Sequence, residues 1–61
     1  MVEKFRARLL EVKVTHEPPL WRWQVLAGDS ELSSDVENAQ IKASFEGYNA
    51  MFLLLAAGWK A

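Results

Sequence analysis

The side chains able to do chemistry are few in this sequence, and their spacing is poor for catalysis. His16 is the only histidine, and the adjacent Glu17 could orient it as a general base. Neighbouring residues of an extended chain point to opposite faces, so this pair is badly placed to work together. Cysteine is absent, which excludes a disulfide framework and a thiolate metal site. We interpret His16 as an exposed loop residue.

Other motifs that signal a reaction are missing. The sequence lacks the G-x-S-x-G nucleophile elbow, and its three glycines lie too far apart to form a phosphate-binding loop. Asp29, Glu31 and Asp35 supply carboxylates, but their spacing fails that of a calcium loop. A chain of 61 residues also has difficulty enclosing a pocket of about 300 Å³. The sequence therefore predicts a protein that is not an enzyme and that uses no metal or cofactor.

Basic residues near the N-terminus suggest nucleic acid as an alternative partner. Residues 1–22 hold five bases and three acids, a net charge of +2, whereas residues 23–61 hold two bases and five acids, a net charge of −3. Arg22 also lies between two tryptophans, a pattern that can stack unpaired bases. The whole chain is nevertheless close to neutral, whereas nucleic-acid binders concentrate basic charge. The candidate nucleic-acid contacts are Arg6, Arg8, Lys13 and Arg22.

Alternating apolar and polar residues predict three strands, at about residues 8–15, 20–27 and 30–34. Pro18 and Pro19 cannot donate to a ladder, so we expect residues 16–19 to form a connecting loop. One face of the predicted sheet is apolar. It carries Leu10, Val12, Val14, Trp21, Trp23, Val25, Ala27 and Leu32.

The pair Gly28-Asp29 predicts a two-residue hairpin of type II′, because glycine readily adopts the positive φ of that turn. The hairpin sets the register of the second and third predicted strands. It pairs Ala27 with Ser30, Val25 with Leu32 and Trp23 with Ser34.

The remainder of the chain predicts one long helix at about residues 35–57. Ser34 and Glu37 match the S-x-x-E capping box at its start, and Gly58 fits the C′ position beyond its end. The predicted fold is α+β: one domain over residues 1–61, with a three-stranded antiparallel sheet and a long C-terminal helix packed on one of its faces.

The predicted helix carries two apolar stripes, and a small sheet can cover only one of them. The aromatic stripe contains Ile41, Phe45, Tyr48, Phe52 and Leu55, and the small-residue stripe contains Val36, Ala39, Ala43, Gly47, Ala50 and Leu54. Bulky sheet residues could fill the space that small helix residues leave, so the pattern does not decide which stripe faces the sheet. The uncovered stripe predicts self-association, with a homodimer expected because two-fold dimers are the commonest closed oligomers.

We therefore expect a protein–protein interaction module. Its candidate self-association residues are either Ala39, Ala43, Gly47, Ala50 and Leu54 or Ile41, Phe45, Tyr48 and Phe52. Another protein is the second possible partner. A membrane is not expected, because the most apolar stretch, residues 50–59, is ten residues long, about half of the roughly 20 that a bilayer span needs.

The segment from Trp21 to Gly58 resembles small bacterial or phage domains that have a W-x-W strand, a glycine turn, a short strand and one alanine-rich helix. Such domains are usually described only as hypothetical proteins. The resemblance covers about two thirds of the chain and implies a small α+β fold, with no activity and no site residues. The lack of cysteine and of an apolar run of signal-peptide length near the N-terminus predicts a cytoplasmic protein.

Overall fold

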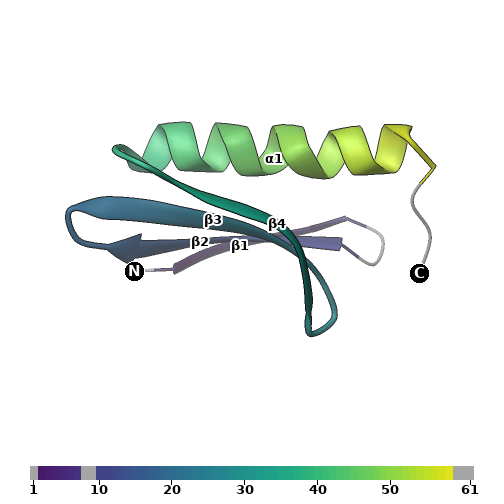
Figure 1. The fold of residues 1–61 in the computed structure, drawn as a ribbon, viewed down its shortest axis with the longest axis horizontal. Helices are drawn as coiled ribbons and strands as arrows, with labels where there is room; N and C mark the ends of the chain where they lie inside the picture. The colour runs from purple at the N-terminus through teal and green to yellow at the C-terminus, as the bar shows by residue number, and fades with distance from the viewer. Residues whose placement is uncertain (1, 8–9, 59–61) are drawn as a thin grey trace.

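The computed structural model describes the backbone of residues 2–7 and 10–58 and the side chains of residues 10–58. It has two layers, an antiparallel sheet and a helix that lies along one face of that sheet (Figure 1). The α+β class and the C-terminal helix on one sheet face are as predicted. In chain order the elements are β1 (Val2–Ala7), β2 (Leu10–Glu17), β3 (Leu20–Ala27), β4 (Ser30–Glu37) and α1 (Gln40–Ala56).

All three predicted strands are present, and β1 adds a fourth at the edge of the sheet, in the order β1-β2-β3-β4. Strand β1 pairs with β2 from Val2↔Thr15 to Ala7↔Leu10. Its sequence lacks a clean alternation, so its pairing with β2 defines it as a strand more than its own pattern does. The first predicted strand, at about residues 8–15, is described from Leu10 onward, and residues 8 and 9 lie outside the described residues.

The loop predicted over residues 16–19 is wrong for its first half. Strand β2 continues through His16 and Glu17, and Glu17 pairs with Leu20, so that Pro18 and Pro19 alone form the turn. Prolines at turn positions remove no ladder hydrogen bond, and the strands can therefore run up to them from both sides.

The turn between β3 and β4 has the predicted length. Gly28 has a φ of 61°, and Ala27 pairs with Ser30 as expected. A side chain at Gly28 would meet no atom within 4 Å, so the turn selects glycine for its backbone conformation and not for lack of space.

The rest of the predicted β3–β4 register is shifted by one residue. An irregularity between Val25 and Leu26 makes Val25 pair with Ser33 in place of Leu32. It likewise makes Trp23 pair with Asp35 in place of Ser34. A β-bulge inserts one extra residue into a strand and reverses the facing of those beyond it. Leu32 is accordingly 38% exposed and does not belong to the core.

The helix begins five residues later than predicted, because β4 continues to Glu37. Ser34 pairs with Gln24 inside the sheet, so the expected capping box does not form. The residue at the N-cap is Ala39, which has a β-region backbone and makes no side-chain cap hydrogen bond. The helix ends at Ala56, one residue before the predicted end, and Gly58 follows with a φ of 86°, as the C′ prediction requires.

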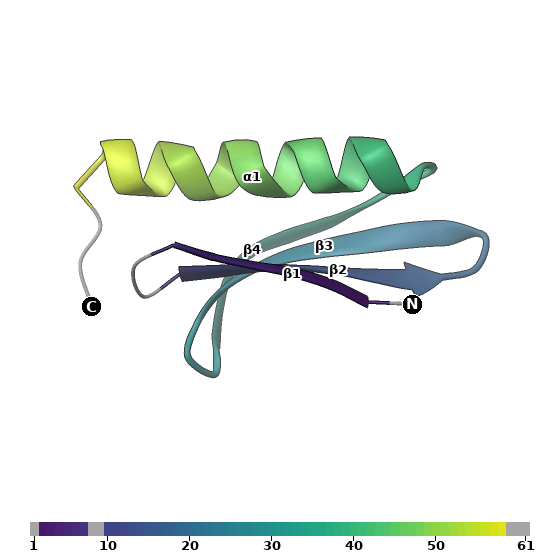
Figure 2. The same cartoon turned by 180° about the vertical axis from the view of Figure 1, so that it is seen from behind.

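The core lies between the helix and the middle strands. Helix α1 contacts β2, β3 and β4 and runs above them as a separate layer when seen from either side (Figures 1 and 2). The buried apolar side chains are Leu10, Val12, Val14, Trp23, Val25, Ala43 and Met51. The helix turns its small residues toward a sheet whose bulky residues occupy the space between the layers.

Gly47 marks the closest approach of the two layers. A Cβ added there would lie 2.8 Å from Val12 Cγ1 and 3.3 Å from Trp23 Cβ. Glycine therefore allows the helix backbone to sit directly on these two side chains. Among the residues that the structure describes, no helix is long and apolar enough to cross a membrane.

Candidate interaction surface

The helix face directed away from the sheet is strongly apolar. We define the outer helix face as Ile41, Phe45, Phe52 and Leu53, which are 82%, 67%, 55% and 62% exposed. Gly47 faces the sheet, and at 100° per residue Phe45 and Phe52 lie on the opposite side of the helix from it. The position of this face therefore follows directly from the packing of the small residues.

Polar and half-buried residues border the outer helix face. Lys42 lies beside it and pairs with Glu37 of β4 at 3.5 Å between Nζ and Oε1, while Asn49 is exposed and uncharged. Tyr48 and Leu55 are half-buried and pack against the core. Ile41, Phe45 and Phe52 thus form an apolar strip along the helix, with Lys42 and Asn49 between this strip and Leu53. An apolar patch with a polar border is the usual arrangement of an interaction site.

The structure decides between the two predicted stripes. Ala43 and Gly47 are buried, and Ala50 and Leu54 pack against the core. Ala39 is the half-buried N-cap. Within α1 the small-residue stripe is thus the face on the sheet. The aromatic stripe is exposed at Ile41, Phe45 and Phe52 and half-buried at Tyr48 and Leu55.

Sequence reasoning missed Leu53 as a member of the outer helix face. It lies about 100° around the helix from Phe52, and so falls outside the narrow 4-3-4-3 spacing that defined the aromatic stripe. The sequence signal that could have identified Leu53 is the absence of charge in the second half of the helix. Lys42 and Glu46 are the only charged residues in α1, and both lie in its first half.

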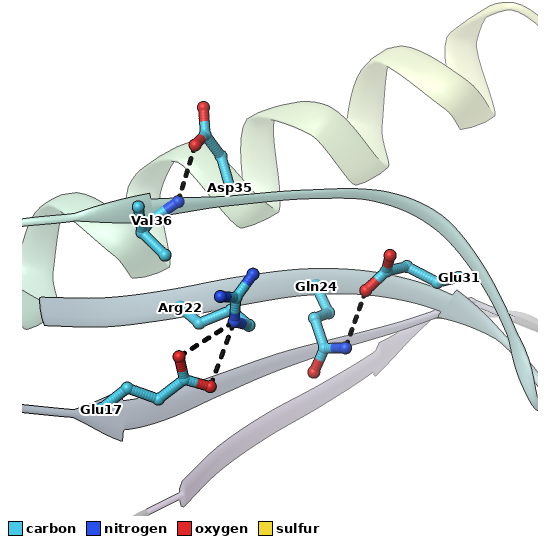
Figure 3. Close-up of polar contacts among 6 residues, drawn as sticks. All are labelled: Glu17, Arg22, Gln24, Glu31, Asp35 and Val36. Carbon is cyan, nitrogen blue, oxygen red and sulfur yellow. Dashed lines mark hydrogen bonds and ion pairs between the residues drawn. The ribbon is translucent and has the colours of Figure 1, made fainter.

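The opposite face of the sheet carries Lys13 and Arg22, two of the four candidate nucleic-acid contacts. Arg22 Nε donates to both carboxylate oxygens of Glu17 at 3.1 Å, and Gln24 Nε2 donates to Glu31 Oε1 at 2.8 Å (Figure 3). The hydrogen bond and the negative charge of Glu17 raise the pKa of Arg22, so its guanidinium remains charged. The positive charge of Arg22 is therefore already paired with the carboxylate of Glu17 in the same sheet.

The other candidate bases do not form a described cluster with Arg22. Lys13 pairs in register with Gln24 and is half-buried. The backbone of Arg6 pairs with Glu11, and Arg8 lies outside the described residues. Within the described side chains this face carries three carboxylates, at Glu11, Glu17 and Glu31, against two bases, at Lys13 and Arg22, so it has no excess of positive charge.

The structure separates His16 from Glu17, the pair considered as a general base and its orienting carboxylate. His16 lies in β2, not in a loop, and stacks on Trp21 with ring centroids 4.1 Å apart. Glu17 points to the other face of the sheet, where it binds Arg22, so the two side chains are separated as strand geometry requires. No group of three or more residues able to hold a metal ion occurs among the described residues.

Glu37 has a structural role that the sequence did not indicate. Trp23 Nε1 donates to its Oε2 at 3.5 Å, and its other oxygen faces Lys42. One carboxylate thus joins β3, β4 and the first turn of α1. The expected role in a capping box does not apply, because Glu37 is the last residue of β4 and not the third residue of a helix.

Comparisons with protein-family models, with curated proteins and with solved structures find no match to this chain. The resemblance to small bacterial or phage domains therefore remains a prediction. The outer helix face is therefore the basis on which a function is proposed.

Proposed function

We propose that this protein is a small, non-catalytic interaction module that self-associates through the outer helix face. The observation that supports it is the outward position of Ile41, Phe45 and Phe52 on a helix whose other side is already packed on the sheet. Scattered single hydrophobic residues need no explanation, but a continuous apolar strip rimmed by polar residues marks an interaction site.

The energetics of a small domain support the same conclusion. A chain of this size buries only about 60% of its unfolded surface and is marginal alone. Disulfides are not available to it, because it has no cysteine. Burial of apolar surface contributes about 25 cal/mol per Å², so association through this strip stabilises the folded chain. The proposal places the module in the cytoplasm, since a chain without cysteine has no need of an oxidising compartment.

The direct test is the mass in solution of the wild type and of two variants at Phe45, measured by light scattering. The wild type is expected to be a dimer at high micromolar concentration. Phe45→Glu should give a folded monomer. The new carboxylate would be buried in the contact between two copies, but it is exposed to water in the single chain. Phe45→Leu is the matched control: it keeps an apolar side chain there and should remain dimeric. Circular dichroism on the same samples confirms that the fold is retained.

A monomeric wild type would contradict self-association. The outer helix face would then be a docking surface for a different protein. Nucleic acid binding by the other sheet face is the alternative function, and titration with single- and double-stranded nucleic acid at two salt concentrations tests it. A basic site would bind more weakly as the salt concentration rises. The pairing of Arg22 with Glu17 makes this the weaker candidate.

A further inference from the structure

We propose that two copies of this chain pair through their α1 helices in antiparallel orientation, with the two-fold axis passing between Tyr48 and Asn49. This inference rests on the proposed self-association and adds its geometry. The assembled dimer has four layers in the order sheet, helix, helix, sheet.

The spacing of the outer helix face is self-complementary in this orientation. Phe45 and Phe52 are equally far from the point between Tyr48 and Asn49, which lies close to the middle of the helix, as are Ile41 and Ala56. In an antiparallel pair Phe45 of one copy lies opposite Phe52 of the other, and the contact occurs twice, as a two-fold interface requires. Aromatic rings pair favourably at centroid distances of about 4.5–7 Å, which helices packed at about 8–10 Å allow.

The exposed area matches what a small dimer needs. Phe45 and Phe52 each have a surface in the range of about 150–250 Å², and more than half of each is exposed. With Ile41 and Leu53 the outer helix face offers roughly 500 Å² of apolar surface per copy, near the upper end of the largest apolar patches on monomers. Two such faces bury about 1,000 Å², which is the lower limit for a specific interface.

The ends of the helix favour the antiparallel arrangement over the parallel one. Helix α1 has no acidic residue in its first turn, no basic residue in its last turn and no side-chain cap at Ala39. The partial charges at its two ends are therefore not compensated by the usual capping charges. An antiparallel partner places its negative end beside the positive end of this helix, whereas a parallel partner places like ends together.

Single cysteine variants test this geometry cleanly, because the chain has no cysteine of its own. In the antiparallel pair the two copies of residue 49 lie about 1.5 Å apart along the helix axis, whereas the two copies of residue 56 lie about 22 Å apart. Disulfide formation requires Cα atoms within about 7 Å. Under mild oxidation Asn49→Cys should therefore shift to twice the monomer mass on a non-reducing gel, and the matched control Ala56→Cys should not.

A mixed sample supplies the second measurement. Ile41→Cys and Ala56→Cys should crosslink with each other when mixed, since these residues lie opposite one another across the proposed axis. Self-linking of Ala56→Cys would show parallel helices and overturn the inference while leaving dimerisation intact. If the wild type is dimeric by light scattering but none of these crosslinks forms, both the geometry and the proposed contact face are wrong. A monomeric wild type overturns self-association itself.

Discussion

The two faces of α1 differ in a way that reverses the usual expectation for an amphipathic helix. The face on the sheet carries Ala43, Gly47 and Met51, whereas the face toward solvent carries Ile41 and Phe45. Both phenylalanines of α1 are thus on the solvent side, and Met51 is the one large side chain of the helix that is fully buried. A helix packs where its side chains fit the opposite layer. Here Val12 and Trp23 of the sheet already fill the space between the two layers, so the helix packs with small residues against them.

The size of its residues therefore does not identify which face of a helix packs against the core. Close packing depends on the summed volume between two layers, so a bulky sheet selects a small-residue helix face. Ile41, Phe45 and Phe52 are then left exposed, and the proposed self-association rests on their exposure. Substitutions on the two faces should therefore have opposite consequences for folding and for association.

The sharpest contrast is between a glutamate on the inner face and one on the outer face. Gly47→Glu should abolish folding, because the new side chain starts 2.8 Å from Val12 Cγ1 and brings an unpaired charge into the core. The free energy of unfolding of a native protein is about 0.05–0.15 kcal/mol per residue, so a domain this small has too little stability to remain folded after such a substitution. Phe52→Glu is the control and should keep its helical circular dichroism spectrum. If both variants unfold, or neither does, the two faces are not assigned correctly.

Much of this fold could be predicted from local pattern. The alternation in β2 and β3 placed Leu10, Val12, Val14, Trp23 and Val25 on one face, and all five are buried. Gly28 has the expected positive φ, and Gly58 the expected place after the helix. These features depend on neighbouring residues alone, which is why a single sequence is enough to find them.

The features that failed depend on contacts between distant residues. Ser34 and Glu37 satisfy the local rule for a helix start, yet pairing with β3 keeps both in a strand. The bulge that exposes Leu32 and the pairing that forms β1 are likewise set by the neighbouring strand. The candidate surface was predicted only as one of two options, because the choice rests on how the sheet and the helix fit together in three dimensions.

A second contrast compares truncation on the two faces. Met51 is fully buried, so Met51→Ala should lower the free energy of unfolding by about 2–5 kcal/mol through lost burial and a remaining cavity. Leu53→Ala changes a residue that is 62% exposed, only two positions further along, and should cost within about 0.5 kcal/mol in the isolated chain. Urea titrations at low protein concentration, where any dimer is dissociated, give both values. Equal losses would mean that Leu53 is packed in the single chain.

The smallest expected change in the free energy of unfolding comes from substitutions at the start of the helix. The residue at which the helix begins determines which residues belong to each of its two faces. Ala39 occupies the N-cap with φ −148° and ψ 145°, a conformation in which serine can accept a hydrogen bond from the first helical turn. Ala39→Ser should therefore raise the free energy of unfolding by about 1 kcal/mol. Ser34→Ala is the matched test of the rejected capping box and should change it by less than about 0.5 kcal/mol, because Ser34 lies in β4. Thermal melts of both variants measure the difference. If Ser34→Ala proves the more disruptive and Ala39→Ser brings no gain, the helix starts at residue 35, and residues 35–39 extend the two faces by more than one turn.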